Sequence, residues 1–174
     1  MSLSKVLICL LLVVSDCYAE EGFAIAPEIT PPTPPIITAD KTNGTISVYW
    51  PDSQKTIVEP ALFGKIKSNE LNLASYDVPG KLTGITPAGS FPVKKMVSWR
   101  LNENILTFIE GKSTIVAIHP LWNGNPDQRR IQRLKSITPD DNRITQGCIN
   151  VDATFFYSVL DNLPDGTILN ILPE

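Results

Sequence analysis

The sequence predicts a mainly β domain with one or two helices. From residue 37 onward, short runs rich in β-branched and aromatic residues alternate with turns that contain glycine and proline. Only two stretches carry both the start and the stop signals of a helix. The 174 residues suffice for one domain with a sizeable core, and no internal repeat is visible.

The first half of the domain contains three predicted strand regions. Residues 45–50 (TISVYW) alternate and follow a turn signal. Residues 55–66 form a second region, which we expect Pro60 to break, because proline cannot donate a backbone hydrogen bond to a neighbouring strand. Residues 76–99 contain several prolines and glycines, which is typical of a loop, and lead into a strand at 91–99.

The second half begins with a predicted hairpin, whose strands cover residues 105–109 and 114–118. The second of these strands is apolar throughout, so we expect it to be central in a sheet, with His119 at its end. Residues 166–172 (GTILNIL) close the chain as a further strand.

Two helices are predicted between these strands. The first covers residues 126–136, where Asn125 is a suitable cap and Pro126 suits the first helical position. The second covers residues 151–164, with Asp152 as its cap and an apolar face behind it. We expect the loop between them to carry the cysteine at position 148.

The N-terminal residues have the pattern of an export signal. Residues 1–19 combine a positive residue, a short apolar core and a small-residue site at Ala19, which predicts a cleaved signal peptide. The apolar run is shorter than the roughly 20 residues that span a bilayer, although an uncleaved anchor stays an alternative. The Pro-rich residues 20–36 are predicted to be a semi-rigid tether, and residues 37–174 the folded domain. We therefore expect an exported protein of the periplasm or cell envelope.

The charge of the chain argues against a nucleic-acid partner. The formal net charge is −3, and removal of the signal leaves it unchanged because that segment carries only Lys5 and Asp16. Nucleic-acid-binding domains are typically strongly basic. We expect the mature chain to be a monomer.

Cleavage leaves a single thiol. Cys9 and Cys17 depart with the signal, so Cys148 has no partner for an internal disulfide. An unpaired cysteine in an exported protein suggests an intermolecular disulfide or a reactive thiol, and a buried, inert cysteine is the alternative. The chain also has one histidine, His119, and a thiol needs a nearby base or cation to act as a nucleophile at neutral pH. One cysteine and one histidine favour a nucleophile–base pair.

Four segments in order resemble the L,D-transpeptidase catalytic domain, often called the YkuD type. They are ITPAGSF (85–91), AIHPLW (117–122), TQGCIN (145–150) and FFYSVLDNLPDGTILNI (155–171). The resemblance covers residues 37–174 and implies that family's mixed β-sandwich or barrel fold.

The resemblance also implies roles for individual residues. Cys148 would be the nucleophile, His119 its base, and the backbone N–H groups of Gly147 and Cys148 would help to hold the oxyanion. Three further side chains would line the substrate channel, namely Thr145, Gln146 and Asn150. Gln146 and Asn150 could equally be solvated loop residues. No metal or organic cofactor is implied.

The implied activity is that of a peptidoglycan L,D-transpeptidase, a transferase of cell-wall biosynthesis and cell shape. The cysteine attacks the bond before the terminal D-alanine of a stem tetrapeptide, and the resulting thioester is passed to an amine acceptor, so both partners are stem peptides of the cell wall. One alternative is a hydrolase, an L,D-carboxypeptidase or endopeptidase, in which water resolves the thioester. Another is a catalytically silent module that binds the cell wall.

The chain departs from the family pattern at three points. Gln146 stands where many relatives have histidine, and Asn150 where arginine is common. Residues 120–147 separate His119 from Cys148 by 28 residues, more than is usual in the family.

We expect part of this 120–147 insert to form a flap beside the thiol, with Arg143 receiving a stem-peptide carboxylate. Arg129, Arg130 and Arg133 are expected on a solvated helix face. Trp122 is expected either to stack on substrate or to anchor the core.

Overall fold

The structure is a computed structural model and describes residues 31–174. The predicted signal, residues 1–19, and residues 20–30 of the predicted tether lie outside the described residues. Among the described residues, no helix combines the length and the apolar character that crossing a membrane would require.

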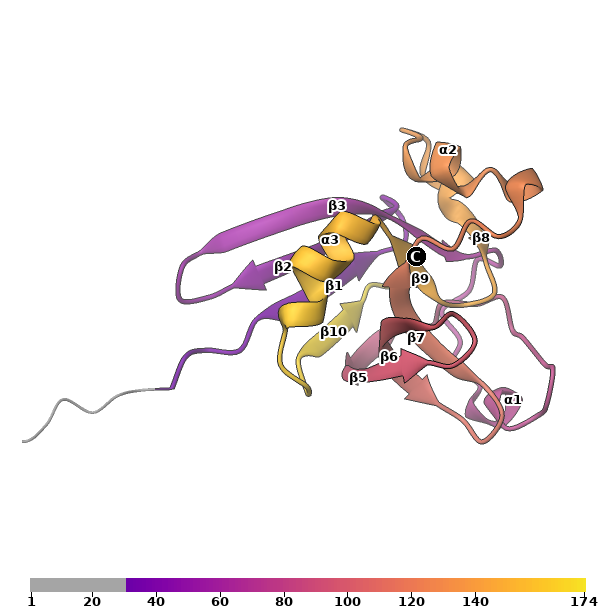
Figure 1. The fold of residues 1–174 in the computed structure, drawn as a ribbon, viewed down its shortest axis with the longest axis horizontal. Helices are drawn as coiled ribbons and strands as arrows, with labels where there is room; N and C mark the ends of the chain where they lie inside the picture. The colour runs from indigo at the N-terminus through magenta and orange to yellow at the C-terminus, as the bar shows by residue number, and fades with distance from the viewer. Residues whose placement is uncertain (1–30) are drawn as a thin grey trace, which may run out of the picture. The chain divides into compact units, whose positions relative to one another are not determined.

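The described residues contain ten strands in one sheet, which is nearly closed and barrel-like (Figure 1). The strand order is β4-β10-β1-β2-β3-β9-β7-β6-β5, and β8 pairs with β3 outside this path. The strands are β1 (Ile36–Asp40), β2 (Thr45–Trp50), β3 (Lys55–Gly64), β4 (Gly89–Pro92), β5 (Lys94–Ser98), β6 (Glu103–Glu110), β7 (Ile115–Pro120), β8 (Arg143–Thr145), β9 (Ile149–Val151) and β10 (Ile168–Ile171).

Helices are few and short in this part of the chain. They are α1 (Leu73–Tyr76), α2 (Arg130–Leu134) and α3 (Ala153–Ser158), with 3₁₀ turns η1 (Pro126–Gln128), η2 (Pro139–Asn142) and η3 (Leu160–Asn162). The predicted fold class, mainly β with few helices, is confirmed. The short α1 was not predicted, because its four residues carry no capping side chain.

Strand alternation builds the core. In β1 and β2, every second residue is buried, which places Ile37, Ile46 and Val48 in one apolar cluster. Phe155 and Phe156 of α3 join the same cluster, so this helix covers the face that the strands bury. Asp152 caps α3 by accepting hydrogen bonds from two backbone N–H groups, as the sequence predicts.

The prediction that Pro60 breaks its strand is wrong. β3 runs unbroken through Pro60, which pairs with Thr45 at the last position where β2 and β3 lie together. From Ala61 onward β3 pairs with β9 instead. The proline therefore sits where the strand changes neighbours, and there its missing N–H group interrupts neither ladder.

The single helix predicted over residues 126–136 is divided in two. Asn125 caps the first turn as predicted, because its side chain accepts a hydrogen bond from Asp127 N at 3.2 Å. Arg129 then adopts a left-handed conformation (φ 51°), which ends η1 and turns the chain before α2 begins at Arg130. Sequence periodicity gives no sign of this break, since arginine is a good helix former.

Two smaller boundaries also differ from the predictions. The strand predicted at 91–99 is divided into β4 and β5, which flank Val93. The short strand β9 lies between Cys148 and α3, so the cysteine precedes a strand rather than the helix directly.

Candidate active site

His119 and the segment that follows Cys148 lie on two neighbouring strands. β7 and β9 are parallel, with His119 opposite Asn150 and Ile118 opposite Ile149. Because side chains alternate between the two faces of a strand, His119 and Asn150 share one face and the two isoleucines share the other. Cys148 directly precedes β9 and stands two residues before Asn150. The isoleucines are fully buried in the core cluster, and Cys148 packs against the same cluster.

The imidazole of His119 is held at both nitrogens. Nδ1 lies 2.8 Å from the carbonyl oxygen of Pro120, and Nε2 lies 2.9 Å from Nδ2 of Asn150. A carbonyl oxygen only accepts, so Nδ1 carries the proton and Nε2 accepts from the Asn150 amide. The ring is therefore a neutral tautomer whose basic lone pair is directed at Asn150.

Burial keeps this imidazole neutral. His119 is 8% exposed. Burial is the main cause that lowers the pKa of His119 to about 4; the nearby charge of Arg130 lowers it further, and the Pro120 carbonyl opposes the shift. At neutral pH the ring carries no charge, and its basic nitrogen is occupied by the amide of Asn150.

Arg130 reaches the same face from the insert. Its Nη1 donates to Oδ1 of Asn150, and its Nε donates to Oε1 of Gln128 at 2.7 Å. The guanidinium also lies over the ring of Trp122, 5.1 Å from the ring centre. A chain of hydrogen bonds thus runs from Arg130 through Asn150 to His119. The expectation of a solvated arginine is wrong for Arg130, which is 7% exposed.

The thiol of Cys148 is protonated in this arrangement. Burial raises its pKa, while a backbone hydrogen bond from Ala117 and the charge of Arg130 act in the opposite direction and only partly offset it. The described residues include no disulfide partner for it. The resting pair is a neutral thiol and a neutral imidazole, rather than a thiolate stabilised by imidazolium.

The turn before Cys148 is fixed by one hydroxyl. Oγ1 of Thr145 donates to the carbonyl oxygen of Cys148 at 2.6 Å and accepts from N of Gly147 at 3.1 Å. Gly147 has φ 127°, and a Cβ there would lie 2.8 Å from the carbonyl oxygen of Ile85. Only glycine fits this position, because both the backbone angle and the available space exclude a side chain.

A second hydroxyl, which sequence reasoning missed, ties this turn to the rest of the sheet. Oγ1 of Thr86 donates to the carbonyl oxygen of Gly147 at 2.8 Å and accepts from N of Gly64 at 2.8 Å. Thr86 is fully buried. It belongs to the ITPAGSF segment, whose sequence marks a loop but gives no sign of a contact with the cysteine turn 61 residues away.

The two backbone groups expected to hold an oxyanion differ in availability. The N–H of Gly147 is engaged by Thr145. Within residues 31–174, no hydrogen bond occupies the N–H of Cys148. The cysteine's own N–H is therefore the free donor of this turn.

Arg143 has a structural role in place of the predicted carboxylate receptor. Its Nη2 forms an ion pair with Glu174 and donates to the carbonyl oxygen of Lys41 at 3.2 Å. The guanidinium of Arg143 therefore already binds a carboxylate, that of Glu174.

The remaining predicted substrate residues are more exposed. Gln146 has an exposed side chain, and its backbone oxygen accepts from N of Gly84 at 3.1 Å. Trp122 is 40% exposed and stacks on Arg130 rather than entering the core.

Two surface hollows of about 370 and 440 Å³ lie elsewhere, and neither is lined by Cys148 or His119. In the described part of the chain, no three His, Cys, Asp or Glu side chains gather as metal ligands would.

Known structures share the fold. No family model and no curated protein sequence matches the chain. The helical cell shape determining protein Pgp2 of Campylobacter jejuni matches at 13% identity with a TM-score of 0.50, over 80% of this chain and 48% of that one. The Ldtfm–avibactam carbamoyl enzyme matches at 15% identity and a TM-score of 0.50, over 82% and 50%. An L,D-transpeptidase of Stackebrandtia nassauensis matches at 13% identity and a TM-score of 0.48, over 82% and 57%.

The chain spans about half the length of the structures it matches. At these identities the likeness is one of fold, and the described domain has the L,D-transpeptidase fold that the sequence predicts.

Proposed function

We propose that this chain is a cysteine acyltransferase that acts on peptidoglycan stem peptides, an L,D-transpeptidase in activity as well as in fold. One observation carries the proposal: the parallel register of β7 and β9, which sets His119 opposite Asn150, two residues after Cys148. The fold shared with Pgp2 and Ldtfm supports it.

The reaction begins when the sulfur of Cys148 attacks the carbonyl carbon that precedes the terminal D-alanine of a stem tetrapeptide. The thiol proton passes to Nε2 of His119 and then to the leaving amine, so D-alanine departs as the carbon–nitrogen bond breaks and the thioester forms. The amide of Asn150 has to release Nε2 for this transfer, because it occupies the lone pair at rest. The N–H of Cys148 supplies a hydrogen bond to the oxyanion.

In the second step, an amine of another stem attacks the thioester. A new amide bond forms, the carbon–sulfur bond breaks, and the thiol is restored with a proton from the attacking amine. If water takes the place of the amine, the product is a trimmed stem with a new carboxylate.

Product analysis tests the proposal. Purified stem tetrapeptides incubated with the protein should yield cross-linked dimers with release of D-alanine, detected by mass spectrometry, and Cys148→Ala should yield none. Trimmed monomers without dimers would assign the hydrolase instead. Unchanged tetrapeptide, with protein whose folding is verified by circular dichroism, would contradict both enzymatic functions.

Avibactam offers a probe that needs no natural substrate, since Ldtfm forms a carbamoyl enzyme with it. We expect a single avibactam adduct on the protein and none on Cys148→Ala. An adduct that persists in Cys148→Ala would place the reactive group elsewhere.

We also propose that residues 1–19 direct export to the cell envelope, where this substrate occurs. N-terminal sequencing of the protein recovered from the envelope should begin after Ala19. A start at Met1 would indicate a retained anchor.

A further inference from the structure

Lys41 is a fully buried cation that the proposed reaction does not use. It follows β1 directly, its side chain is 0% exposed, and its Nζ lies 3.4 Å from a carboxylate oxygen of Glu174. Nζ donates three hydrogen bonds, to the carbonyl oxygens of Ser68 and Thr86 at 2.9 and 3.0 Å and to Oδ1 of Asn69 at 2.9 Å. Only a protonated amine has three donors, so this set of acceptors requires the charged lysine.

One of these bonds reaches a residue that lies outside the strands. Thr86 belongs to the loop before β4 and precedes Pro87, so the peptide group between them has no N–H and offers only the Thr86 carbonyl for hydrogen bonding. Lys41 binds that carbonyl. The hydroxyl of Thr86 accepts from N of Gly64 and donates to the carbonyl oxygen of Gly147. Thr86 thus connects the buried ammonium to the cysteine turn.

The carbonyl that Thr86 binds belongs to the same peptide group as the free N–H of Cys148. A trans peptide is planar, so its C=O and N–H point in opposite directions and fixing one fixes the other. Thr145 holds the peptide groups on either side, through the N–H of Gly147 and the carbonyl of Cys148. The group between them is held by Thr86. Glycine restricts backbone rotation least, so the direction of this N–H depends on the Thr86 hydroxyl.

We propose that Lys41 is a positioning residue that orients the N–H of Cys148, the donor for the oxyanion, by way of Thr86. The inference rests on the proposed function and extends the machinery that stabilises its oxyanion. The ammonium fixes the Thr86 carbonyl, and the Thr86 hydroxyl then fixes the peptide group that carries the donor. Glu174 provides the counter-charge that a buried ammonium requires.

Two reactions of the same thiol separate the orientation of this donor from the placement of the sulfur. Acylation by a stem tetrapeptide builds an oxyanion, whereas alkylation by iodoacetamide displaces iodide from a saturated carbon and builds none. A misdirected N–H should slow the acylation and leave the alkylation unchanged. A turn that is displaced as a whole, or a partly unfolded protein, should change both rates.

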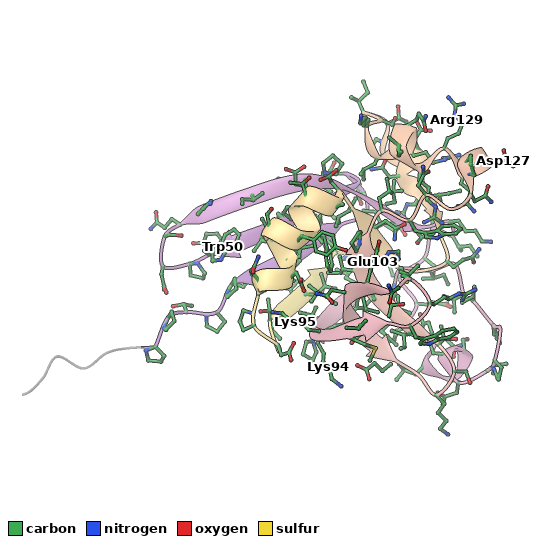
Figure 2. The ribbon with its side chains drawn as sticks, viewed as in Figure 1. Trp50, Lys94, Lys95, Glu103, Asp127 and Arg129 are labelled. Carbon is green, nitrogen blue, oxygen red and sulfur yellow. The ribbon has the colours of Figure 1, made fainter. Side chains whose placement is uncertain are left out.

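Lys41→Met keeps the length of the side chain and removes its donors. We expect acylation to slow by roughly 10- to 100-fold, because losing an oxyanion donor costs about 100- to 1,000-fold and here the donor is only misdirected. Alkylation should keep the rate of the unmodified protein. Lys95→Met, at an exposed lysine of β5, is the matched control and should alter neither rate (Figure 2).

Equal effects of Lys41→Met on both reactions, or no effect on either, would overturn the proposal. Circular dichroism verifies that each variant is folded. If Lys41→Met does not fold, Lys41→Gln takes its place, because its polar side chain is too short to reach the Thr86 carbonyl and the same selective loss is expected.

Variants of Thr86 show whether Lys41 acts through it. Thr86→Val should slow acylation selectively, and Thr86→Ser, which keeps the hydroxyl, should not. In the double variant of Lys41→Met and Thr86→Val the two effects should not add, because both changes interrupt one chain of contacts. Additive effects would contradict the route through Thr86.

The amide signal of Cys148 separates this proposal from the function on which it rests. In protein labelled with ¹⁵N-cysteine, the Cys148 peak is assigned by its absence from Cys148→Ala. It should shift in Lys41→Met and stay in place in Lys95→Met. If the protein is never acylated but the peak shifts, Lys41 orients the N–H and the proposed function fails. If the protein is acylated and the peak does not move in Lys41→Met, the function stands and the positioning role fails.

Discussion

The electrostatics of His119 decide how the proposed nucleophile works. The imidazole is buried, neutral and bonded through its basic nitrogen to Asn150, and the pKa of the Cys148 thiol is raised by its burial. In the proposed mechanism, the thiol transfers its proton to the imidazole during attack on the substrate, and no thiolate forms before the substrate binds. The thiol is therefore protected from indiscriminate reaction when no substrate is bound.

The reactivity of the thiol should reflect this resting state. We expect the rate of alkylation of Cys148 by iodoacetamide to rise continuously with pH and to be still rising at about pH 9, because the thiol pKa lies above its ordinary value of about 8.5. The measurement is the alkylation rate from pH 5 to 10, with the urea-unfolded protein as the control. A plateau near neutral pH would indicate a thiolate–imidazolium pair and contradict this description.

The same imidazole makes stability depend on pH. In the unfolded chain His119 titrates near its usual value of about 6.5, and in the folded protein near 4, so the unfolded state binds more protons between these values. Stability is thus full above about pH 6.5 and falls as the pH drops towards 4, by roughly 3 kcal/mol. Urea unfolding at pH 7 and pH 4 should show this loss in the unmodified protein and not in His119→Gln. Equal losses in both proteins would contradict the shift.

At the scale of elements, the site depends on a parallel contact between two short strands. β9 has three residues and follows directly on the cysteine turn, so its register with β7 sets where the thiol lies. Two hydroxyls hold the turn: Thr145 within it and Thr86 from the loop before β4. Both threonines are buried, and their hydroxyls hold the backbone of the cysteine turn in position through hydrogen bonds.

Thr86 should be essential for this placement. In Thr86→Val, the N–H of Gly64 and the carbonyl of Gly147 both lose their partner in a buried site, so we expect a loss of about 2 to 4 kcal/mol in the free energy of unfolding. Thr86→Ser keeps the hydroxyl and should lose much less. Urea unfolding of the three proteins measures this, and equal stability of the valine and serine variants would exclude the proposed link.

Elements that are specified locally were predictable from the sequence. Alternation in residues 45–50 fixes β2 because one face of that strand meets the core, and Asp152 caps α3 with its own side chain. The errors at Pro60 and Arg129 have a different origin. Each depends on the neighbour that the chain meets: β3 changes partner at Pro60, and the insert turns at Arg129 to bring α2 onto the site. A single sequence does not encode these neighbours in a local pattern.

At the scale of the whole molecule, distant parts of the chain meet at Glu174. Its carboxylate contacts Arg143 at the start of β8 and lies 3.4 Å from Nζ of Lys41, whose side chain is fully buried. Arg143 also donates to the carbonyl oxygen of Lys41. This cluster ties the turn after β1 to the segment that leads into the cysteine turn.

Loss of the Glu174 charge should therefore weaken the fold. Glu174→Gln leaves Lys41 and Arg143 without their counter-charge in a mostly buried site, and we expect a loss of roughly 2 to 4 kcal/mol in the free energy of unfolding. Asp140→Asn is the matched control, because its ion pair with Lys67 is exposed, and it should leave stability unchanged. Equal effects of the two changes in urea unfolding would contradict a structural role for the Glu174 cluster.

The candidate site was predictable only in part for the same reason. The pairing of Cys148 with His119 is implied by the resemblance of two short motifs and stays a prediction, although β7 and β9 lie side by side. The ion pair of Arg143 and the burial of Arg130 were not predictable, since both are arginines of one insert and only tertiary contacts distinguish them. Glu174 engages the first, and the second is buried against Asn150 and Trp122.

The mass of the intact protein after brief exposure to a stem tetrapeptide and an acid quench tests the central claim most directly. The account predicts that the protein gains the mass of the peptide less D-alanine, that fragmentation locates this mass on Cys148, and that Cys148→Ala gains nothing. A folded protein that releases D-alanine while Cys148 stays unmodified, or an adduct on another residue, would contradict it.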